Sequence, residues 1–325
     1  MERRELLKWV GAATLARVSA GCDRLVLLGT PAGLEPITSN AEFYTYYCCG
    51  LPDIDPATHE TVIAHEGVEL ARFDLAFLQS LTPRTKEHTL ECIGAQPRIQ
   101  NISNAVWTGL PLSEVLEALG VEVPASAVGL RLVGADEYHA GVPIEDLLDA
   151  PIWLVWEMNG EPLAFEHGAP ARLLVPGRYG VKNLKWLAEI AFVDTPHVSY
   201  WTERGWDEPS VYQPNTFVKT PLEGTPVRVD DRVRLMGTAF AGVDPVVKVE
   251  LRVDDGEWIE CELDYQTGEP DLWVLWSAEW AATAGTHTFQ VRCETASGAR
   301  SNADPDGTDP WHGYDGSMQI VLEVT

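Results

Sequence analysis

The stretch NGEPLAFEHGAPARLLVPGRYGVKNLKW, Asn159–Trp186, gathers basic residues in a chain that is otherwise strongly acidic. Glycine and proline recur from residue 168 onward too often for a helix, and the apolar run 173–175, which ends in Pro-Gly, predicts a short strand followed by a turn. Cations beside such a turn can hold a phosphorylated ligand, because arginine presents a planar fork of donors and lysine a compact charge. An ordinary basic surface turn is the competing interpretation. The basic residues are His167, Arg172, Arg178, Lys182 and Lys185.

The order and spacing of residues favour the ligand-binding interpretation. The stretch has an Asn-Gly-Glu turn, a His-Gly-x-Pro-x-Arg step, a Val-Pro-Gly turn and a basic-x-x-Lys-Trp ending, and it closely resembles the signature of the sulfite oxidase family of molybdopterin enzymes. Two further blocks resemble segments of that family. They are Leu90–Val121, where a cysteine is followed by Trp-x-Gly-x-x-Leu, and the extended segment Ile37–Tyr47.

The resemblance implies an α+β fold of two domains. Residues 37–217 would form a mixed α/β molybdopterin-binding domain, and residues 218–325 an immunoglobulin-like β-sandwich that makes a homodimer. Residue patterns in the first region predict strands at 60–73, 127–133 and 151–158, a short helix at 113–119 and one helical turn at 144–148. No G-x-G-x-x-G sequence occurs, so a nucleotide-binding doubly wound sheet is not expected.

From residue 228 onward the pattern is that of short strands. Runs with period-two character at 229–237, 246–253, 258–263, 272–278, 287–293 and 318–324 are separated by turn residues, which is typical of an antiparallel sandwich. Cys261 and Cys293 lie on two of these predicted strands. A disulfide between them and two separate buried thiols are both compatible with the pattern.

Composition excludes several classes of protein. The 325 residues can bury cores for two domains, and no apolar run reaches the roughly 18 residues that a membrane-spanning helix needs. The net charge of −26 argues against binding to nucleic acid, which requires net cations. The six cysteines form neither CxxC nor CxxCH, so no attached haem is expected, and the electron carrier would be an external molecule.

Residues 1–36 are expected to be an export signal and leader. Paired arginines at 3 and 4, followed by the apolar run 9–16, resemble a twin-arginine signal, which suits a protein that folds around its cofactor before export. The sequence SAGC, which ends at Cys22, resembles a lipoprotein cleavage site and would provide a lipid anchor. The location implied is periplasmic or otherwise extracytoplasmic. An ordinary amphipathic helix is the alternative.

Cys92 is the candidate metal ligand. A soft metal centre prefers thiolate, and one protein thiolate can complete a coordination sphere whose other sulfurs come from the pterin dithiolene. By the resemblance, Cys92 is therefore the molybdenum ligand and a catalytic residue. The alternative is a buried structural cysteine after the strand 89–91.

The resemblance also assigns the residues that hold the pterin. Arg172 and Lys185 suit its phosphate, whereas His167 and Asp136 suit contacts with the rings or the linker. For Asp136, a plain turn acid is an equal alternative. The full cofactor-binding set is Asn40, Phe43, Tyr44, Cys92, Asp136, His167, Arg172, Asn183, Leu184 and Lys185.

Departures from the family pattern concern the substrate. Sulfite oxidases surround the oxyanion with arginines, but this chain has Tyr46 at one such position and Gln96-Pro97 after the metal cysteine, with Arg98 displaced by one. Trp206 stands in place of a substrate-side tyrosine. A pocket bordered by these aromatic residues, with the adjacent Cys48 and Cys49 near its rim, is too neutral for sulfite.

The favoured hypothesis is an exported molybdopterin oxidoreductase that transfers an oxygen atom to or from a small molecule other than sulfite. A sulfite dehydrogenase, with Arg98 or Arg204 reaching the oxyanion, is the first alternative. A non-catalytic protein that keeps the cofactor fold for binding at the cell surface is the second. The retained Cys92 argues against it, since such a protein has no need of a soft-metal thiolate.

Overall fold

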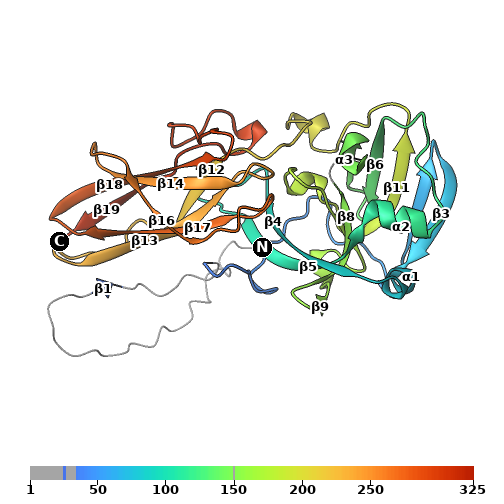
Figure 1. Ribbon diagram of the computed structural model, residues 1–325, viewed down its shortest axis with the longest axis horizontal. Helices are drawn as coiled ribbons and strands as arrows, with labels where there is room; N and C mark the ends of the chain where they lie inside the picture. Colours follow the sequence, from blue (N-terminus) through green and yellow to red (C-terminus); the bar gives the residue numbers. More distant parts are fainter. Residues whose placement is uncertain (1–24, 27–33, 149–150) are drawn as a thin grey trace, which may run out of the picture.

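The structure, a computed structural model, describes residues 25–26, 34–148 and 151–325. It consists of two regions that lie end to end along the long axis of the molecule, a mixed α/β region and a β-sandwich (Figure 1). The twin-arginine sequence and Cys22 lie outside the described residues. None of the helices described is long and apolar enough to span a bilayer.

The first region is built on two sheets. One has the strand order β3-β2-β11-β6-β7, in which only the β2 and β11 pair is parallel. The other has the order β10-β8-β5-β4 with β9 beside β8, and its pairs are antiparallel. Their bounds are β2 Glu60–His65, β3 Val68–Asp74, β4 Arg84–Glu91, β5 Ile102–Pro111, β6 Gly129–Gly134, β7 His139–Pro143, β8 Trp153–Met158, β9 Glu161–Pro162, β10 Arg172–Leu174 and β11 Leu187–Val193.

The core of this region lies between the two sheets. Ile63, Leu132 and Ile190 from the first sheet and Leu154 and Leu173 from the second have no exposed surface and belong to one apolar cluster. Both sheets therefore contribute side chains to a shared interior, and the burial of that apolar surface is the main term that holds the sheets together.

Helices are short and few, so α+β describes this region only loosely. The helix predicted at 113–119 is α2, Leu112–Ala118, which buries Val115 and Leu116, and the helical turn predicted at 144–148 is α3, Glu145–Leu148. A further helix is α1, Leu75–Ser80. Asp74 caps its N-terminus, because the Asp74 side chain accepts a hydrogen bond from the amide of Phe77. The 3₁₀ helices are η1 Phe165–His167, η2 Gly180–Lys182, η3 Thr202–Arg204 and η4 Pro310–His312.

The second region is a sandwich of two sheets, with orders β1-β13-β17-β16 (β12 beside β13) and β15-β14-β18-β19. The predicted antiparallel sandwich is present, while its immunoglobulin-like class stays a prediction. The strand bounds are β1 Leu25–Val26, β12 Asn215–Thr220, β13 Arg232–Phe240, β14 Val246–Val253, β15 Ile259–Glu260, β16 Glu262–Tyr265, β17 Val274–Ala281, β18 Gly285–Thr295 and β19 Gln319–Val324.

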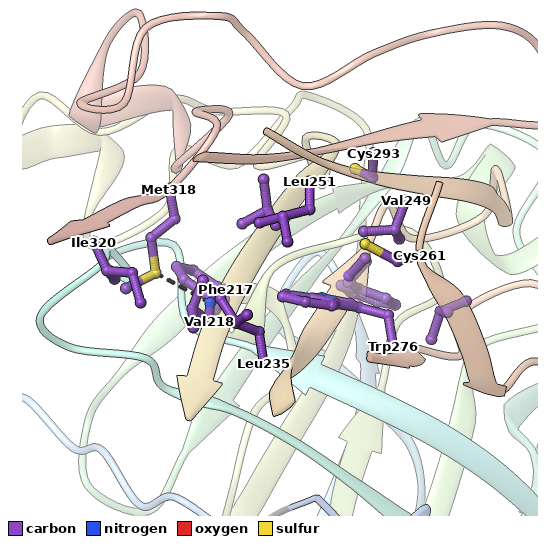
Figure 2. Close-up of a cluster of buried hydrophobic side chains, with 14 of the residues drawn as sticks. Phe217, Val218, Leu235, Val249, Leu251, Cys261, Trp276, Cys293, Met318 and Ile320 are labelled. Carbon is purple, nitrogen blue, oxygen red and sulfur yellow. Dashed lines mark hydrogen bonds between the residues drawn. The ribbon is translucent and has the colours of Figure 1, made fainter. Parts of the chain in front are cut away.

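Large apolar side chains fill the space between the two sheets of the sandwich, among them Phe217, Leu251 and Trp276 (Figure 2). Cys261 and Cys293 both lie in this core as free thiols. Cys293 Sγ donates a hydrogen bond to the backbone oxygen of Asn215 at 3.3 Å. The interpretation as two separate buried thiols therefore describes this structure.

The two regions share interior contacts at the end of β4. Thr89 donates its amide proton to the Asp271 carbonyl at 2.9 Å, and its hydroxyl accepts from the amide of Trp273 at 3.0 Å. Strand β12, which includes residues 217 and 218 on either side of the expected domain boundary, pairs with β13 of the sandwich. Asn215 of β12 also donates to both carboxylate oxygens of the buried Glu91, at 3.1 Å each. The residue that precedes Cys92 is thus anchored by the sandwich.

Candidate functional site

A cavity of about 390 Å³ opens where the loops after β4 and β6 meet the basic stretch. Side chains from five segments that are distant in sequence line it, so its chemistry is assembled only by the fold. All of the site residues predicted from the sequence line this cavity except Asn40. They are Phe43, Tyr44, Tyr46, Cys92, Asp136, His167, Arg172, Asn183, Leu184, Lys185 and Trp206.

Cys92 follows the last residue of β4. A tight turn holds it, because its amide donates to Asn101 O at 2.9 Å and its carbonyl accepts from the amide of Ala95 at 2.8 Å. Burial raises the pKa of its thiol to about 11, and the neighbouring Glu91 acts in the same direction. Without a cation the thiol keeps its proton. A metal ion bound there would displace that proton and stabilise the thiolate.

The absence of a side chain at Gly180 lets the basic stretch approach Cys92. A Cβ atom at this position would lie 2.9 Å from Tyr44 Oη and 3.3 Å from the backbone oxygen of Glu91. The first distance is too short for non-bonded carbon and oxygen, and the second is tighter than most such contacts. The η2 segment that carries Gly180 therefore packs directly on the cysteine turn, and it brings the basic residues to the metal-ligand candidate.

Arg172, at the start of β10, is a buried cation that no carboxylate neutralises. Its guanidinium lies 5.2 Å from the Trp107 ring centroid and donates to the carbonyls of His167 at 3.0 Å and Asn183 at 3.1 Å. Its Nε is buried without a hydrogen-bond partner. Burial lowers the pKa of Arg172 to about 10. A buried charge with an unpaired donor is costly, so this position requires an anionic or strongly accepting ligand.

Lys185 is the second cation of the cavity lining that no carboxylate neutralises. Its Nζ donates to Glu166 O at 2.9 Å and lies 4.2 Å from the Trp186 ring centroid. Burial, and then the charge of Arg172, lower the pKa of Lys185 to about 7. None of the ion pairs among the described residues includes Arg172 or Lys185.

The other basic side chains of the stretch serve the fold. Arg178 pairs with Asp146 at 2.8 Å, and Lys182 pairs with Glu208 at 2.9 Å. Neither lines the cavity. Two cations of one stretch are therefore neutralised away from the cavity, whereas the two that line it are not. This contrast fits a phosphate between Arg172 and Lys185.

His167 is held by Asn40 from behind. Its Nε2 lies 2.8 Å from the Asn40 carbonyl, which can only accept, so Nε2 carries the proton and Nδ1 remains an acceptor. Burial lowers the pKa of His167, which keeps the ring neutral. Asn40 is not among the lining residues, and its side chain bonds Glu161 Oε2, Met158 O and Asn159 Nδ2, so its contact with the pterin stays a prediction. Asn40 positions His167.

Asn183, Leu184 and Asp136 line the cavity in different ways. The Asn183 side chain accepts from the amide of Val175 at 2.7 Å and donates to the carbonyls of Arg178 and Tyr179, both at 2.9 Å. Its amide group is thus fully engaged in the turn. Leu184 is buried and belongs to the apolar core. Asp136 combines both interpretations of it, since it accepts from the amide of Tyr138 at 3.2 Å within a turn and also lines the cavity.

Aromatic side chains also line the cavity. A Cβ atom on Gly94 would lie 3.7 Å from Trp206 Cη2 and 3.9 Å from Cys92 Sγ, so the indole and the thiol both lie within van der Waals reach of this position. Trp206 packs edge to face on Trp201 at 6.2 Å and on Trp311 at 5.1 Å. Tyr46 is 54% exposed at the mouth. Burial, and next the proximity of Cys92, raise its pKa.

Comparisons with known proteins agree with this geometry. Residues 49–201 match the family described as an oxidoreductase molybdopterin binding domain. The mitochondrial sulfite oxidase of Rattus norvegicus is 26% identical over 319 residues, which cover 84% of this chain and 58% of that protein. Residues 49–201 are thus an oxidoreductase molybdopterin binding domain by this match, and the chain as a whole is similar to sulfite oxidases.

Other members and neighbours differ in what they act on. Nitrate reductase 1 (NADH) of Arabidopsis thaliana is 28% identical over 269 residues, which cover 64% of this chain and 29% of that protein. The crystal structure of the sulfane dehydrogenase SoxCD from Paracoccus pantotrophus has a TM-score of 0.75, covering 98% of this chain and 94% of that chain at 18% identity. At this identity the likeness concerns the fold. This chain spans 58% of the length of the rat sulfite oxidase.

The residues present fit the molybdopterin of this family. Cys92 offers a thiol at one wall of the cavity, and the orphaned Nε of Arg172 together with the unpaired Lys185 offers charge for a phosphate. His167 offers Nδ1 as an acceptor for a ring or linker donor. The Asn183 side chain, in contrast, is engaged by the backbone of its own turn.

The structure keeps the remaining candidate arginines outside the cavity lining. Arg98 is exposed, and Arg204 lies 3.5 Å above the Tyr200 ring centroid and 3.5 Å from Glu203. Neither belongs to the residues that line the cavity, whose described arginine and lysine members are Arg172 and Lys185. The lining near Tyr46 and Trp206 therefore includes neither of these two arginines.

Sequence reasoning missed several residues of the lining. The Tyr138 hydroxyl donates a hydrogen bond to Val181 O. Lys185 Nζ lies over the Tyr47 ring, 5.3 Å from its centroid. Each stands within two residues of a predicted site residue, so the only available signal was that proximity. The missed lining residues with polar or aromatic side chains are Thr45, Tyr47, Asn101, Tyr138, Glu166, Trp186 and Trp201.

Proposed function

We propose that this protein is a molybdenum-dependent oxidoreductase that transfers an oxygen atom to or from a small molecule other than sulfite. The observation that carries the proposal is the composition of one cavity. Its lining includes two cations without carboxylate partners, the Cys92 thiol, and the aromatic side chains of Tyr46 and Trp206. A cofactor with an anionic end would lie against the two cations, and the substrate would meet the metal beside the aromatic side chains.

The residues of the chain have separate tasks in this proposal. Cys92 binds the metal, and Arg172 and Lys185 hold the phosphate of the pterin. His167, fixed by Asn40, accepts a hydrogen bond from the pterin. When bound, the molybdenum supplies the two-electron redox chemistry. Trp206 and Tyr46 exclude water and shape the space for the substrate.

A neutral or zwitterionic substrate, such as a sulfoxide or an N-oxide, suits this lining. A doubly charged anion needs cations at the reacting atom, because an unpaired charge in a poorly hydrated site is costly. The structural neighbour from Paracoccus pantotrophus, named a sulfane dehydrogenase, supports the idea that this fold also serves substrates other than sulfite.

Sulfite remains the first alternative because the curated relatives at 26% identity are named sulfite oxidases. It would require Arg98 or Arg204 to turn into the cavity. A binding protein without catalysis is the second alternative. It leaves unexplained why a thiol and a buried guanidinium with an unpaired donor line the same cavity.

The direct test begins with the purified protein. Molybdenum and pterin content are measured per chain, and sulfite, a sulfoxide, an N-oxide and nitrate are then assayed with artificial electron donors and acceptors. We expect one metal per chain and turnover of a neutral or zwitterionic compound. A protein that binds no molybdenum when produced with a full cofactor supply would support the binding-only alternative, and preferential turnover of sulfite would support the first alternative.

The setting of the reaction is part of the same proposal. The chain would be exported by the twin-arginine route, be anchored through a lipid on Cys22, pair with a second copy through the sandwich, and exchange electrons with an external carrier rather than with a haem of its own. Replacing Arg3 and Arg4 by lysine should trap the protein in the cytoplasm. Unchanged export of that variant would remove this route.

A further inference from the structure

Cys48 and Cys49 form a pair of thiols at the mouth of the cavity. Their Sγ atoms are 2.7 Å apart, Cys48 lines the cavity, and Cys49 is exposed. They follow directly on Tyr46 and Tyr47, and Gly50 with φ of +97° turns the chain immediately after them. No role in holding the cofactor or shaping the aromatic lining uses these two sulfurs.

The groups around the pair come from several segments of the cavity wall. Burial, the contact with Cys49 and the charge of Asp136 raise the pKa of Cys48 to about 12. Lys185 and Tyr138 also lie near enough to interact electrostatically with Cys48, and Tyr200 with Cys49. The inner thiol is therefore protonated and screened, whereas the outer thiol meets solvent first.

The covalent geometry of neighbouring residues makes a bond between these sulfurs labile. Adjacent Cα atoms across a trans peptide are about 3.8 Å apart. Most disulfides join Cα atoms that are about 4.4 to 6.8 Å apart, so a bond between adjacent cysteines is strained. Strained and exposed disulfides have more oxidising potentials and are readily reduced again. The pair is suited to reversible rather than structural chemistry.

We propose that Cys48 and Cys49 form a dithiol site that exchanges with small external disulfides at the mouth of the cavity. Cys49 attacks one sulfur of the external disulfide, which releases one thiol and leaves a mixed disulfide on Cys49. Cys48 then attacks the Cys49 sulfur, which releases the second thiol and forms the Cys48–Cys49 bond. The pair loses two electrons and two protons, and the two released thiols take them up.

The test uses the metal-loaded protein with Cys22→Ser, so that the N-terminal cysteine does not react. The probe is excess 2-hydroxyethyl disulfide, which is uncharged and is therefore not repelled by an acidic protein. Intact mass is measured over time. We expect the protein to lose the mass of two hydrogen atoms without carrying an adduct, and a monothiol reductant to reverse the change.

Variants separate the two steps. Cys48→Ser should accumulate one stable mixed disulfide, because the resolving thiol is gone. Cys49→Ser should react at least about tenfold more slowly, since the remaining thiol is inner and protonated. The double variant should not change, with the buried Cys261 and Cys293 as internal controls. Stable adducts on the protein with both thiols, no reaction, or equal rates for the two single variants would overturn the proposal.

Discussion

At the scale of single residues, the site depends on one thiol and two cations. Among the described residues, the thiol has no cation beside it, and the two cations have no carboxylate partner. Cys92 keeps a proton that a metal would displace, and Arg172 has a donor atom that nothing in the protein satisfies. These features destabilise the empty cavity. A bound metal would stabilise the Cys92 thiolate, and a bound phosphate would accept from the unpaired donor of Arg172. Both groups would then favour the occupied cavity.

Replacement of the metal ligand should abolish turnover without unfolding the protein. In Cys92→Ser the side chain keeps its size, but a serine oxygen is a harder ligand than thiolate and alters the potential of the metal. We expect normal unfolding temperature, retained pterin and loss of activity by a factor of at least about 100. Full activity in this variant would remove Cys92 from the site.

Loss of the buried guanidinium should weaken cofactor retention. A charge-assisted hydrogen bond contributes about 1.5 to 3 kcal/mol, so Arg172→Ala should lower pterin affinity roughly 10- to 100-fold, with Lys185→Ala acting more mildly. Arg178→Ala is the matched control, because this arginine of the same stretch pairs with Asp146 outside the cavity. Pterin content per folded chain decides the matter. Equal content in all of these variants would show that the phosphate lies elsewhere.

Lys185 makes the stability of the cofactor-free protein depend on pH. Its pKa is about 7 in the folded protein, below the roughly 10.4 of a free lysine, so the unfolded chain binds more protons between these values. Stability should therefore rise as pH increases from about 7 toward 9, relative to Lys185→Met. The measurement is the unfolding temperature of the wild-type protein and of Lys185→Met at several pH values in this range. A bound phosphate should suppress the difference, and parallel curves without cofactor would contradict the assignment.

At the scale of elements, the site depends on how closely η2 packs on the turn after β4. Gly180 permits this contact, while the sandwich strand β12 anchors the same turn through Asn215 and Glu91. The metal-ligand candidate therefore lies between an element of its own region and an element of the other. A small displacement of η2 or of β12 should therefore shift the position of Cys92.

Gly180→Ala tests this packing. The added methyl group would lie 2.9 Å from Tyr44 Oη and 3.3 Å from the backbone oxygen of Glu91, so the Tyr44 side chain or η2 must shift. We expect a destabilisation of about 1 to 3 kcal/mol and lower molybdenum content. Gly160→Ala serves as the control, because its Cβ would meet nothing within 4 Å and only the backbone strain of a φ of +77° is added. Equal molybdenum content in the two variants would show that the close approach is not required.

At the scale of the whole molecule, the net charge of −26 acts on every anion that approaches the cavity. Arg172 is buried and Lys185 partly buried, and the exposed Tyr46 and Tyr47 stand at the mouth. Long-range repulsion and the aromatic lining thus act in the same direction against a dianionic substrate.

Sulfite kinetics at two salt concentrations test this combination. We expect poor sulfite oxidation with an artificial acceptor at low salt and a modest rise in kcat/KM at high salt, since salt screens repulsion over about one Debye length. A neutral sulfoxide or N-oxide assayed with a donor serves as the control and should show little salt dependence. Efficient sulfite turnover at low salt would refute the prediction and would mean that an arginine enters the cavity.

Local sequence alone determined much of this protein. The spacing of glycine, proline and basic residues around Arg172 is a covalent property of the chain, as is the alternation that predicts β14 at its observed bounds, Val246–Val253. The position of Cys92 after a strand and the replacement of an arginine by Tyr46 could likewise be recognised without a structure. Turns and strands can be recognised from the sequence because turn geometry and strand period depend on only a few neighbouring residues.

Only the tertiary structure decided which of these residues have partners. Five basic residues in one stretch look alike in sequence, yet Arg178 and Lys182 meet carboxylates brought from residues 146 and 208, while Arg172 and Lys185 meet none. The side chain of Asn183 is engaged by the backbone of its own turn, and Asn40 supports His167 instead of lining the cavity. Pairing and burial depend on contacts between segments far apart in the chain, and no local pattern encodes them.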